Sequence, residues 1–350
     1  MKKITHKKLN WVIKQIYEKK IPLFIHGTFG IGKSDVCRAT AKELGVDFID
    51  VRLSQLEPSD IRGLPTVETI KVNGEEKEKV TKWLPPNFLP RDKNTKAIIL
   101  LDELNTSPPS VQAQAYELIL DRRCGDYTLP DGIVIIGAGN TIEDKANIFE
   151  MATPLLNRFT HTELSIPTID EWNLWAFDNK VDGRIIGYLT TYPNRLFGYN
   201  QKNKDKAINT PRTWEFTSRL IDGVTDLKDI ELLSSSAVGE GVAVEFVAFL
   251  SLNQKIDIEG ILKNPKNINK IKELDVKYSV ITAINEYFKR KKTKENLERI
   301  YNVCKEMEVE FSTILLKMML SVDYKFIREN TKEIKGGETF LQSYIKYLHE

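Results

Sequence analysis

Hydrophobic and polar residues follow different patterns in the two halves of the chain. Up to about residue 167, short apolar runs alternate with stretches of helical spacing. Apolar runs bounded by turn residues are typical of buried parallel strands, and helices between successive strands are typical of a doubly wound α/β sheet. The predicted strands are 22–26, 47–53, 97–101, 132–138 and 161–166, and the predicted helices are 4–17, 33–44 and 110–120.

Two hairpins interrupt this α/β pattern. Segments 66–72 and 77–83 flank Asn73-Gly74, a strong signal for a two-residue hairpin turn. Segment 121–129 predicts a second, tighter hairpin around Gly125-Asp126. Hairpins inserted into an α/β core lie on the surface, where loops often carry function.

After Pro167 the strand pattern stops and helical spacing continues. We expect domain boundaries near Pro167 and, less sharply, near residue 265, where a Lys- and Asn-rich stretch (263–272) predicts a solvated connection. The expected domains are an α/β core at 1–167 with hairpins inserted at about 66–83 and 121–130, a helical region at 168–265 and a C-terminal helical extension at 266–350. The predicted helices of the second half are 170–177, 212–221, 227–252, 276–289 and 294–305.

Charge and cysteine content narrow the class of protein. The 51 Lys and Arg residues against 49 Asp and Glu residues give a net charge of +2, which disfavours a strongly basic nucleic-acid binder. The basic N-terminus leads into no apolar segment, and the most apolar stretch, 238–252, contains two glutamates, so neither a signal peptide nor a membrane anchor is expected. Three separated cysteines encode neither a disulfide framework nor a zinc site and favour a cytoplasmic location: Cys37, Cys124 and Cys304.

A glycine-rich loop carries the strongest chemical signal. Between a predicted strand and a predicted helix, eight residues fit the pattern GxxxxGK[ST]: Gly27, Thr28, Phe29, Gly30, Ile31, Gly32, Lys33 and Ser34. The glycines allow backbone N–H groups to converge on phosphates at the positive end of the helix, with Lys33 at the β/γ oxygens and the Ser34 hydroxyl on Mg²⁺. An accidental match is the alternative, and the strand–loop–helix context argues against it.

Polar residues also follow two of the predicted strands. Asp102 and Glu103 end the strand at 97–101, where the carboxyl ends of parallel strands face a ligand crevice. Asp102 would hold Mg²⁺ through water and Glu103 would orient and polarise an attacking water. Asn140, after the strand at 132–138, could touch the γ-phosphate and that water. Alone, these residues would be read as a helix cap or as turn residues.

Two arginines have weaker local signals. Arg158 ends a predicted helix, where a cation usually stabilises the helix dipole, and nothing local makes it catalytic in its own subunit. Arg212 begins a helix, where a cation is slightly unfavourable, so a partner such as a phosphate is expected. His26 and His161 lie at strand edges and are interpreted as structural.

The order and spacing of these motifs resemble an AAA+ ATPase, specifically the MoxR-like branch, over about residues 10–225. The resemblance implies that Gly27–Ser34 is the phosphate loop, that Asp102 and Glu103 are the Mg²⁺ and water carboxylates, and that Asn140 is the first sensor. Two segments look like the family's lead into its insert hairpin and its pre-sensor hairpin: 56–65 and 121–130.

The resemblance further implies that Arg158 is an arginine finger acting on the neighbouring subunit and that Arg212 is the second sensor in a helical lid. The implied protein is a homo-oligomeric ring, expected to be a hexamer, that uses Mg²⁺ and ATP for chaperone-like remodelling or assembly of a protein partner. MoxR-like ATPases often work with a von Willebrand factor A-domain protein, which makes such an adaptor a candidate.

Two other functions stay open. One is a nucleic-acid-translocating AAA+ motor, which the near-zero net charge disfavours. Arg122 and Arg123 on the second hairpin could contact nucleic acid or a neighbouring subunit, although a charged hairpin face is the simpler interpretation. The other is a nucleotide-gated assembly scaffold with little turnover. A GTPase is disfavoured because no guanine-reading NKxD motif follows Glu103.

Overall fold

The computed structural model describes residues 1–72, 75–141, 144, 148–200, 205–254, 256–334 and 336–337. The chain divides into two compact units, Met1–Pro167 and Thr168–Glu350. The predicted turn at Asn73-Gly74 lies outside the described residues, as do residues 338–350 of the predicted C-terminal extension. The division into three domains stays a prediction.

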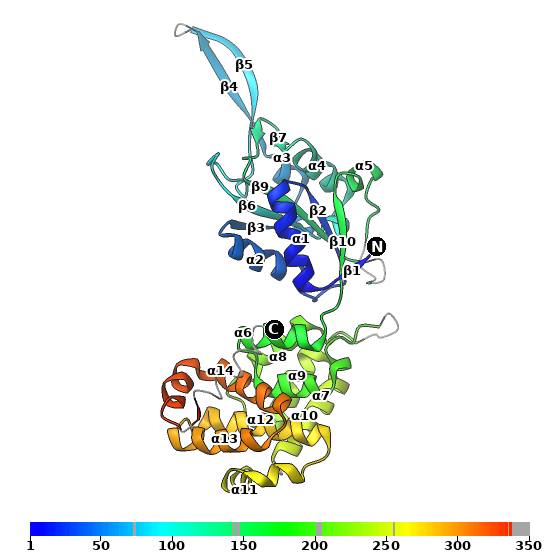
Figure 1. Ribbon diagram of the computed structural model, residues 1–350. Helices are drawn as coiled ribbons and strands as arrows, with labels where there is room; N and C mark the ends of the chain where they lie inside the picture. Colours follow the sequence, from blue (N-terminus) through cyan, green and yellow to red (C-terminus); the bar gives the residue numbers. More distant parts are fainter. Residues whose placement is uncertain are drawn as a thin grey trace. The chain divides into compact units, whose positions relative to one another are not determined.

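A six-stranded sheet forms the centre of the first unit, and all its strands run parallel (Figure 1). The five predicted strands are present, with bounds within two residues of those predicted. β1 is not predicted, because two residues carry no periodicity. Across the sheet the strands are β1 (Lys3–Ile4), β10 (Thr160–Leu164), β2 (Leu23–His26), β9 (Ile133–Gly139), β6 (Ala97–Asp102) and β3 (Asp47–Arg52).

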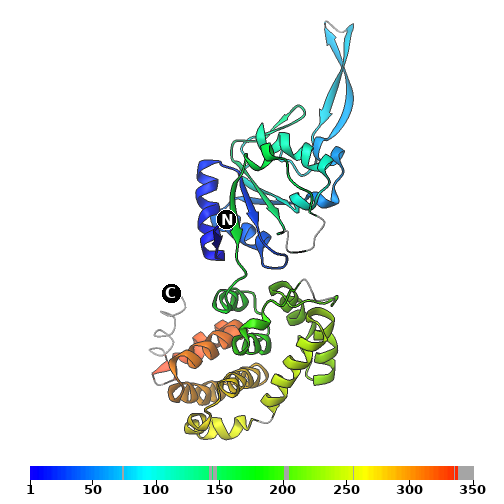
Figure 2. The same cartoon turned by 90° about the vertical axis from the view of Figure 1, so that its right-hand side faces the viewer.

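Helices cover both faces of this sheet (Figures 1 and 2). α1 (His6–Lys19) and α2 (Lys33–Leu44) pack together on one face, where α1 contacts β9 and α2 contacts β6. On the other face α4 (Pro109–Leu120) shares a buried cluster with side chains of β6 and β9. This arrangement confirms the predicted doubly wound α/β fold class. The remaining helical segments are short: η1 (Leu53–Gln55), α3 (Pro58–Arg62), η2 (Leu104–Thr106) and α5 (Thr153–Leu156).

Both predicted hairpins form antiparallel pairs. β4 (Leu64–Val72) pairs with β5 (Glu75–Leu84), and this long hairpin extends away from the rest of the unit (Figure 2). β7 (Arg123–Cys124) pairs with β8 (Tyr127–Thr128). The base of the long hairpin touches the turn of the short one, since the backbone N–H of Trp83 donates to the Asp126 carboxylate at 2.9 Å.

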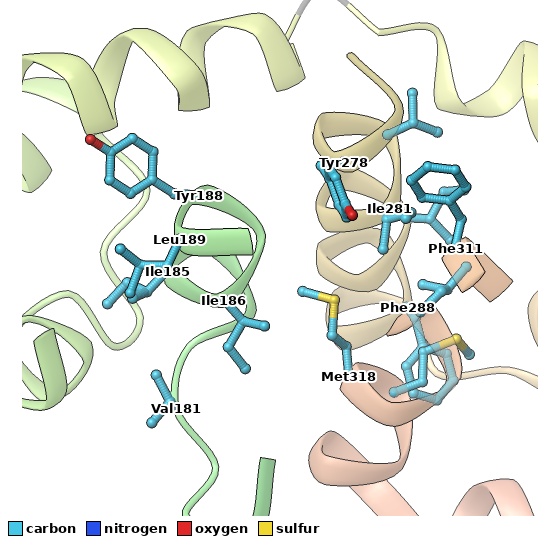
Figure 3. Packing of buried hydrophobic residues seen from close by; sticks show 14 of the residues in the cluster. Val181, Ile185, Ile186, Tyr188, Leu189, Tyr278, Ile281, Phe288, Phe311 and Met318 are labelled. Carbon is cyan, nitrogen blue, oxygen red and sulfur yellow. The ribbon is translucent and has the colours of Figure 1, made fainter. Parts of the chain in front are cut away.

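The second unit is helical in its described residues, and its helices share one large apolar core. Figure 3 shows side chains of α7, α12 and α14 in this core, among them Leu189, Ile281 and Met318. The helices are α6 (Ile169–Asp178), α7 (Gly183–Thr191), η4 (Pro193–Arg195), α8 (Pro211–Leu220), α9 (Leu227–Val238), α10 (Glu240–Gln254), α11 (Ile258–Lys263), η5 (Pro265–Lys270), α12 (Leu274–Arg290), α13 (Lys294–Glu306) and α14 (Val309–Thr331).

The sequence prediction of one continuous helix over 227–252 is wrong. Gly239 separates α9 from α10 and has φ 92° and ψ 152°, a conformation that favours glycine and ends α9. The stretch 263–272, predicted as a solvated connection, contains η5 and the buried Ile268. Within the described residues, no helix combines the length and the apolarity that crossing a membrane requires.

Candidate functional site

The glycine-rich loop connects the end of β2 to the start of α2. Gly30 and Gly32 have φ values of 70° and 93°, which glycine adopts without the steric cost that a side chain imposes. Gly32 is the N-cap of α2, whose first turn has N–H groups without partners inside the helix. Together with the helix dipole, these N–H groups make the end of the loop suited to an anion such as a phosphate.

Lys33 links the loop to the end of β9. Its Nζ donates to the carbonyl oxygens of Gly27 at 2.7 Å and Thr28 at 2.9 Å, and to Oδ1 of Asn140 at 3.2 Å. The side chain is 9% exposed, so this positive charge is held among oxygen atoms at the edge of the sheet. The structure therefore brings Lys33 and Asn140, which are 107 residues apart, into direct contact.

Ser34 and Asp102 also meet, and they do so on the β6 side of the loop. The Ser34 hydroxyl donates to Oδ2 of Asp102 at 2.8 Å, across 68 residues of sequence. A hydroxyl and a carboxylate are oxygen ligands of the kind Mg²⁺ prefers, and Mg²⁺ is commonly bound by one or two carboxylates together with substrate phosphates. These two side chains therefore fit a magnesium ion that accompanies a phosphate ligand. In the described part of the chain, no group of three or more His, Cys, Asp and Glu could hold a metal.

Glu103 has an unusual backbone conformation beside Asp102. Its φ of 59° and ψ of 31° lie in the left-handed region, which is uncommon for residues other than glycine. Such conformations cost on the order of 1–3 kcal/mol and cluster at functional sites. The Glu103 carboxylate accepts a hydrogen bond from the hydroxyl of Ser54, which follows the neighbouring strand β3. The sequence prediction does not include Ser54, because a serine after a strand is an ordinary turn residue.

A second residue that sequence reasoning missed lies against the loop itself. Asp144 is 8% exposed and accepts hydrogen bonds from the Thr28 hydroxyl and, at 2.9 Å, from the backbone N–H of Thr141. Its contact with Thr28 spans 116 residues. Nothing in the local sequence signals this contact, because Asp144 belongs to neither the loop motif nor a predicted strand.

Two histidines form a hydrogen-bonded chain beside the loop. Nε2 of His161 donates to the carbonyl oxygen of Leu156 at 2.7 Å, which leaves Nδ1 to accept from Nε2 of His26 at 3.1 Å. Burial first, and then the neighbouring His161, lower the pKa of His26 to about 4. The His26 imidazole is thus neutral near pH 7, and both rings form hydrogen bonds inside the fold, which agrees with the structural interpretation.

Arg158 lies at the opposite edge of the sheet from the loop. It precedes β10, whose Thr160 pairs with the first residue of β2 and whose Glu163 pairs with the last, His26. The two edges are therefore separated by the length of β2, about 13 Å for four residues. Arg158 is exposed, and its guanidinium has no hydrogen bond or ion pair with the residues that the structure describes.

The other arginines of interest differ from one another. Arg212 lies in the second unit, in the first turn of α8, and is exposed. Arg122 donates to the carbonyl oxygens of Pro130 at 2.7 Å and Ile133 at 3.0 Å, so its guanidinium bonds to the segment that leads from the hairpin into β9. Arg123 is exposed on the same hairpin. A contact of these hairpin arginines with a neighbouring subunit therefore stays open for Arg123 alone.

Comparison with known proteins finds a family model that matches the part of the chain carrying this site. Residues 23–164 match the family model described as "ATPase family associated with various cellular activities (AAA)". No curated protein matches the chain. Among solved structures, the chain is similar to the RuvB Holliday junction branch migration motor of Thermotoga maritima, with 15% identity, a TM-score of 0.34 and 75% of each chain covered.

It is also similar to NtrX from Brucella abortus in complex with ATP, with 14% identity, a TM-score of 0.38, and coverage of 90% of this chain and 67% of that one. These similarities are loose, so the assignment of the domain rests on the family model and on the sheet and loop described above. The matched residues run from β2 to β10 and include the phosphate-type loop, Asp102 and Asn140. The segment that carries the site, residues 23–164, is therefore similar to the AAA ATPase family model.

Proposed function

We propose that the first unit binds Mg²⁺ and ATP at the carboxyl edge of its sheet and hydrolyses ATP. The observation that carries this proposal is the 2.8 Å hydrogen bond from Ser34 to Asp102, since it joins the end of the loop to the end of β6. Lys33 lies beside them, in contact with Asn140. A hydroxyl, a carboxylate and an ammonium converging at one sheet edge are the groups that phosphoryl transfer with a magnesium ion requires.

The loop residues bind the phosphates. Backbone N–H groups of Gly27–Ser34 surround them, and the Lys33 ammonium stabilises negative charge on the β- and γ-phosphate oxygens. Ser34 and Asp102 would hold Mg²⁺, which when bound neutralises charge that develops during the transfer. The Lys33 ammonium has three N–H donors and bonds to Gly27, Thr28 and Asn140, so we expect at least one of these bonds to be exchanged for a phosphate oxygen.

Glu103 and Asn140 act on the attacking water. Glu103 orients and polarises this water as it approaches the γ-phosphate. Its left-handed backbone conformation sets the direction in which its carboxylate leaves the chain after Asp102. Asn140 lies next to Lys33 and contacts the γ-phosphate and the same water. The hydrogen bond from Ser54 holds the Glu103 carboxylate at the side of β3 before it engages the water.

Two arginines complete the proposal, and neither belongs to the groups described at the carboxyl edge of the sheet. The exposed position of Arg158 at the opposite sheet edge supports a role in a neighbouring subunit's site, as an arginine finger of a homo-oligomeric ring. A hexamer is the form that the sequence resemblance implies. Arg212, exposed at the start of α8, is the proposed second sensor, which binds the nucleotide from the helical unit.

In this proposal, ATP hydrolysis drives the remodelling or assembly of a protein partner. The MoxR-like resemblance, the net charge of +2 and the two inserted hairpins together favour remodelling or assembly of a protein client in the cytoplasm, with a von Willebrand factor A-domain protein as a candidate adaptor. Stimulation of turnover by DNA or RNA would instead favour a nucleic-acid motor.

Binding of a fluorescent ATP analogue and release of phosphate test the core of this proposal. Lys33→Ala should lose nucleotide affinity, because the phosphates lose the charge that the loop supplies. Glu103→Gln should bind normally and turn over about 10²–10⁴-fold more slowly. Lys42→Ala removes the same charge from the exposed last turn of α2 and should leave both measurements unchanged. Tight binding by Lys33→Ala, or a wild-type protein without turnover, would contradict the proposal.

A further inference from the structure

Asn140 directly follows β9 and lies past the last residues of that strand that pair with a neighbouring strand. The pairing of β6 with β9 ends at Leu101 and Gly137, and the pairing of β2 with β9 ends at His26 and Gly139. The next residue, Asn140, therefore has no neighbouring strand to fix its backbone. Buried backbone N–H and C=O groups nevertheless need hydrogen-bond partners.

The side chain of Asn105 supplies both partners. Its Oδ1 accepts the backbone N–H of Asn140 at 3.1 Å, and its Nδ2 donates to the carbonyl oxygen of the same residue at 2.8 Å. A side-chain amide thus binds Asn140 as a neighbouring strand would. Asn105 is 7% exposed, and both bonds are part-buried.

The surrounding backbone is built for this contact. A Cβ atom on Gly139 would lie 2.4 Å from Oδ1 of Asn105, so a side chain there would displace the amide. Asn105 itself belongs to η2, which begins directly after Glu103, and its carbonyl oxygen accepts the N–H of Phe149 at 2.8 Å. The amide therefore ties the segment that follows Glu103 to the residue that contacts Lys33.

We infer that Asn105 is a positioning residue for the reaction proposed above. By holding both backbone groups of Asn140, it fixes the direction in which the Asn140 side chain leaves the sheet, toward Lys33 at 3.2 Å. It also couples that direction to the segment carrying Glu103. Asn105 touches neither nucleotide nor water in this role, so its effect on turnover passes through Asn140. This inference rests on the proposed function.

A purely structural role for Asn105 predicts a different result, namely a loss of stability without a specific loss of turnover. Gln112 provides the matched control: it is 5% exposed, and its side chain donates to the carbonyl oxygen of Ser107 at 3.0 Å, close to Asn105 in sequence. Gln112→Leu should destabilise the fold as Asn105→Leu does, because both leave a buried carbonyl unpaired, yet keep kcat within about twofold.

The kinetic test is a double-mutant cycle on the full chain. Removing one preorganised polar group from such a site costs about 10²–10³-fold in kcat, so Asn140→Ala should show a loss of about that size and Asn105→Leu a loss of at least tenfold. Affinity for a non-hydrolysable ATP analogue should change little. In the Asn140→Ala background, Asn105→Leu should change kcat less than about twofold. Equal losses from Asn105→Leu in both backgrounds would overturn the inference.

Amide hydrogen exchange tests the same contact without relying on turnover. Asn105→Leu removes the acceptor and should speed exchange of the Asn140 N–H, whereas Asn105→Asp keeps an acceptor and should preserve its protection. Unchanged protection in Asn105→Leu would also overturn the inference, and Asn105→Asp serves if Asn105→Leu does not fold. A wild-type protein without ATP turnover would instead refute the proposed function, while the exchange result would still decide whether Asn105 positions Asn140.

Discussion

Both units bury polar side chains, but they use them differently. In the first unit Lys33 and Asn105 connect segments that are far apart in sequence, at the carboxyl ends of neighbouring strands. In the second unit the buried Arg184 forms its ion pair with Asp182, two residues away, at 2.8 Å. Arg184 also donates to two backbone carbonyl oxygens that follow α8, those of Ile221 and Val224.

This difference separates a candidate site from a structural ion pair. These contacts of Arg184 all end inside the second unit, at the Asp182 carboxylate before α7 and at two backbone carbonyl oxygens after α8. Around Lys33 the partners are loop carbonyls and a side-chain oxygen at the sheet edge, where parallel α/β sheets bind ligands. Burial of charge alone would not distinguish the two, whereas the placement of the partners does.

Arg158 tests whether placement at the carboxyl edge of the sheet marks every functional residue. It is exposed and lies away from that edge, yet it is proposed to act in catalysis. Arg158→Ala should bind ATP nearly as the wild type does and turn over about 10³–10⁵-fold more slowly, since an arginine finger stabilises the transition state more than the ground state. Phosphate release and analogue binding, measured at high protein concentration, check this. Arg328→Ala, an exposed arginine of the second unit, is the charge-matched control.

Mixing two inactive variants shows whether Arg158 acts across subunits. Lys33→Ala retains Arg158, and Arg158→Ala retains Lys33, so a mixed ring contains complete sites and should regain part of the activity. Dilution below the concentration of assembly should remove the rescue. If mixed rings form, as native mass spectrometry would show, and no activity returns, the assignment in trans is wrong.

Arg184 tests the claim that the ion pair of the second unit stabilises the fold and has no part in nucleotide binding. Arg184→Met leaves Asp182 buried without its partner and should lower the free energy of unfolding of the second unit by about 3–5 kcal/mol. Affinity for the ATP analogue should not change in the absence of denaturant. Urea unfolding can be followed by the fluorescence of the tryptophans of the second unit: Trp172, Trp175 and Trp214.

An exposed pair of the same unit gives the matched control. Arg219 bonds to Glu215 one helical turn away on the surface of α8, and such pairs contribute about 1 kcal/mol or less. Arg219→Met should therefore unfold close to the wild type. A loss of nucleotide affinity in Arg184→Met, without a loss of stability, would remove the distinction drawn between the two units.

The sequence predicts the centre of the sheet well because β2, β6 and β9 are buried on both faces and read as continuous apolar runs, as in Ala97–Asp102. The loop at Gly27–Ser34 is equally readable, since all its residues are contiguous. Ser54, Asn105 and Asp144 could not be predicted in the same way. Their partners lie 35 to 116 residues away, and locally each is an ordinary turn residue.

The helical unit is harder to read for a different physical reason. α7 spans only nine residues, which include two glycines and a buried arginine, and the sequence prediction omits it. The merged helix at 227–252 fails because apolar spacing continues through Gly239. That glycine also packs near the carbonyl oxygen of Ala207, a contact that no local pattern signals. The roles of Arg212 and of the helices after about residue 225 stay predictions.

His26 provides a structural polar residue within the first unit itself. It directly precedes the loop at Gly27–Ser34, yet it is interpreted as structural. It bonds to His161 at 3.1 Å, and its ring lies 4.5 Å from that of Phe24, between their centroids. Its pKa of about 4 in the folded chain lies below the ordinary value of 6.5. Burial contributes most, followed by His161, with Lys33 and the N-terminus acting in the same direction and Glu163 against them.

The lowered pKa fixes the sign of the pH dependence. Between pH 6.5 and 4 the unfolded chain binds a proton at His26 that the folded chain does not, so the free energy of unfolding should fall as pH decreases through this window. His26→Phe keeps an aromatic ring and removes the titration, so its free energy of unfolding should fall less over the same range. Urea unfolding at several pH values between 7.5 and 4 measures the free energy of unfolding of both proteins, and carboxylates that titrate in both cancel when one curve is subtracted from the other.

The difference between the two free energies of unfolding should be constant above about pH 7 and should change steadily below 6.5, while turnover at pH 7.5 stays within a few-fold of the wild type. Parallel curves over the whole range would mean that His26 titrates as it does in the unfolded chain, and that its bond to His161 contributes nothing to keeping it neutral.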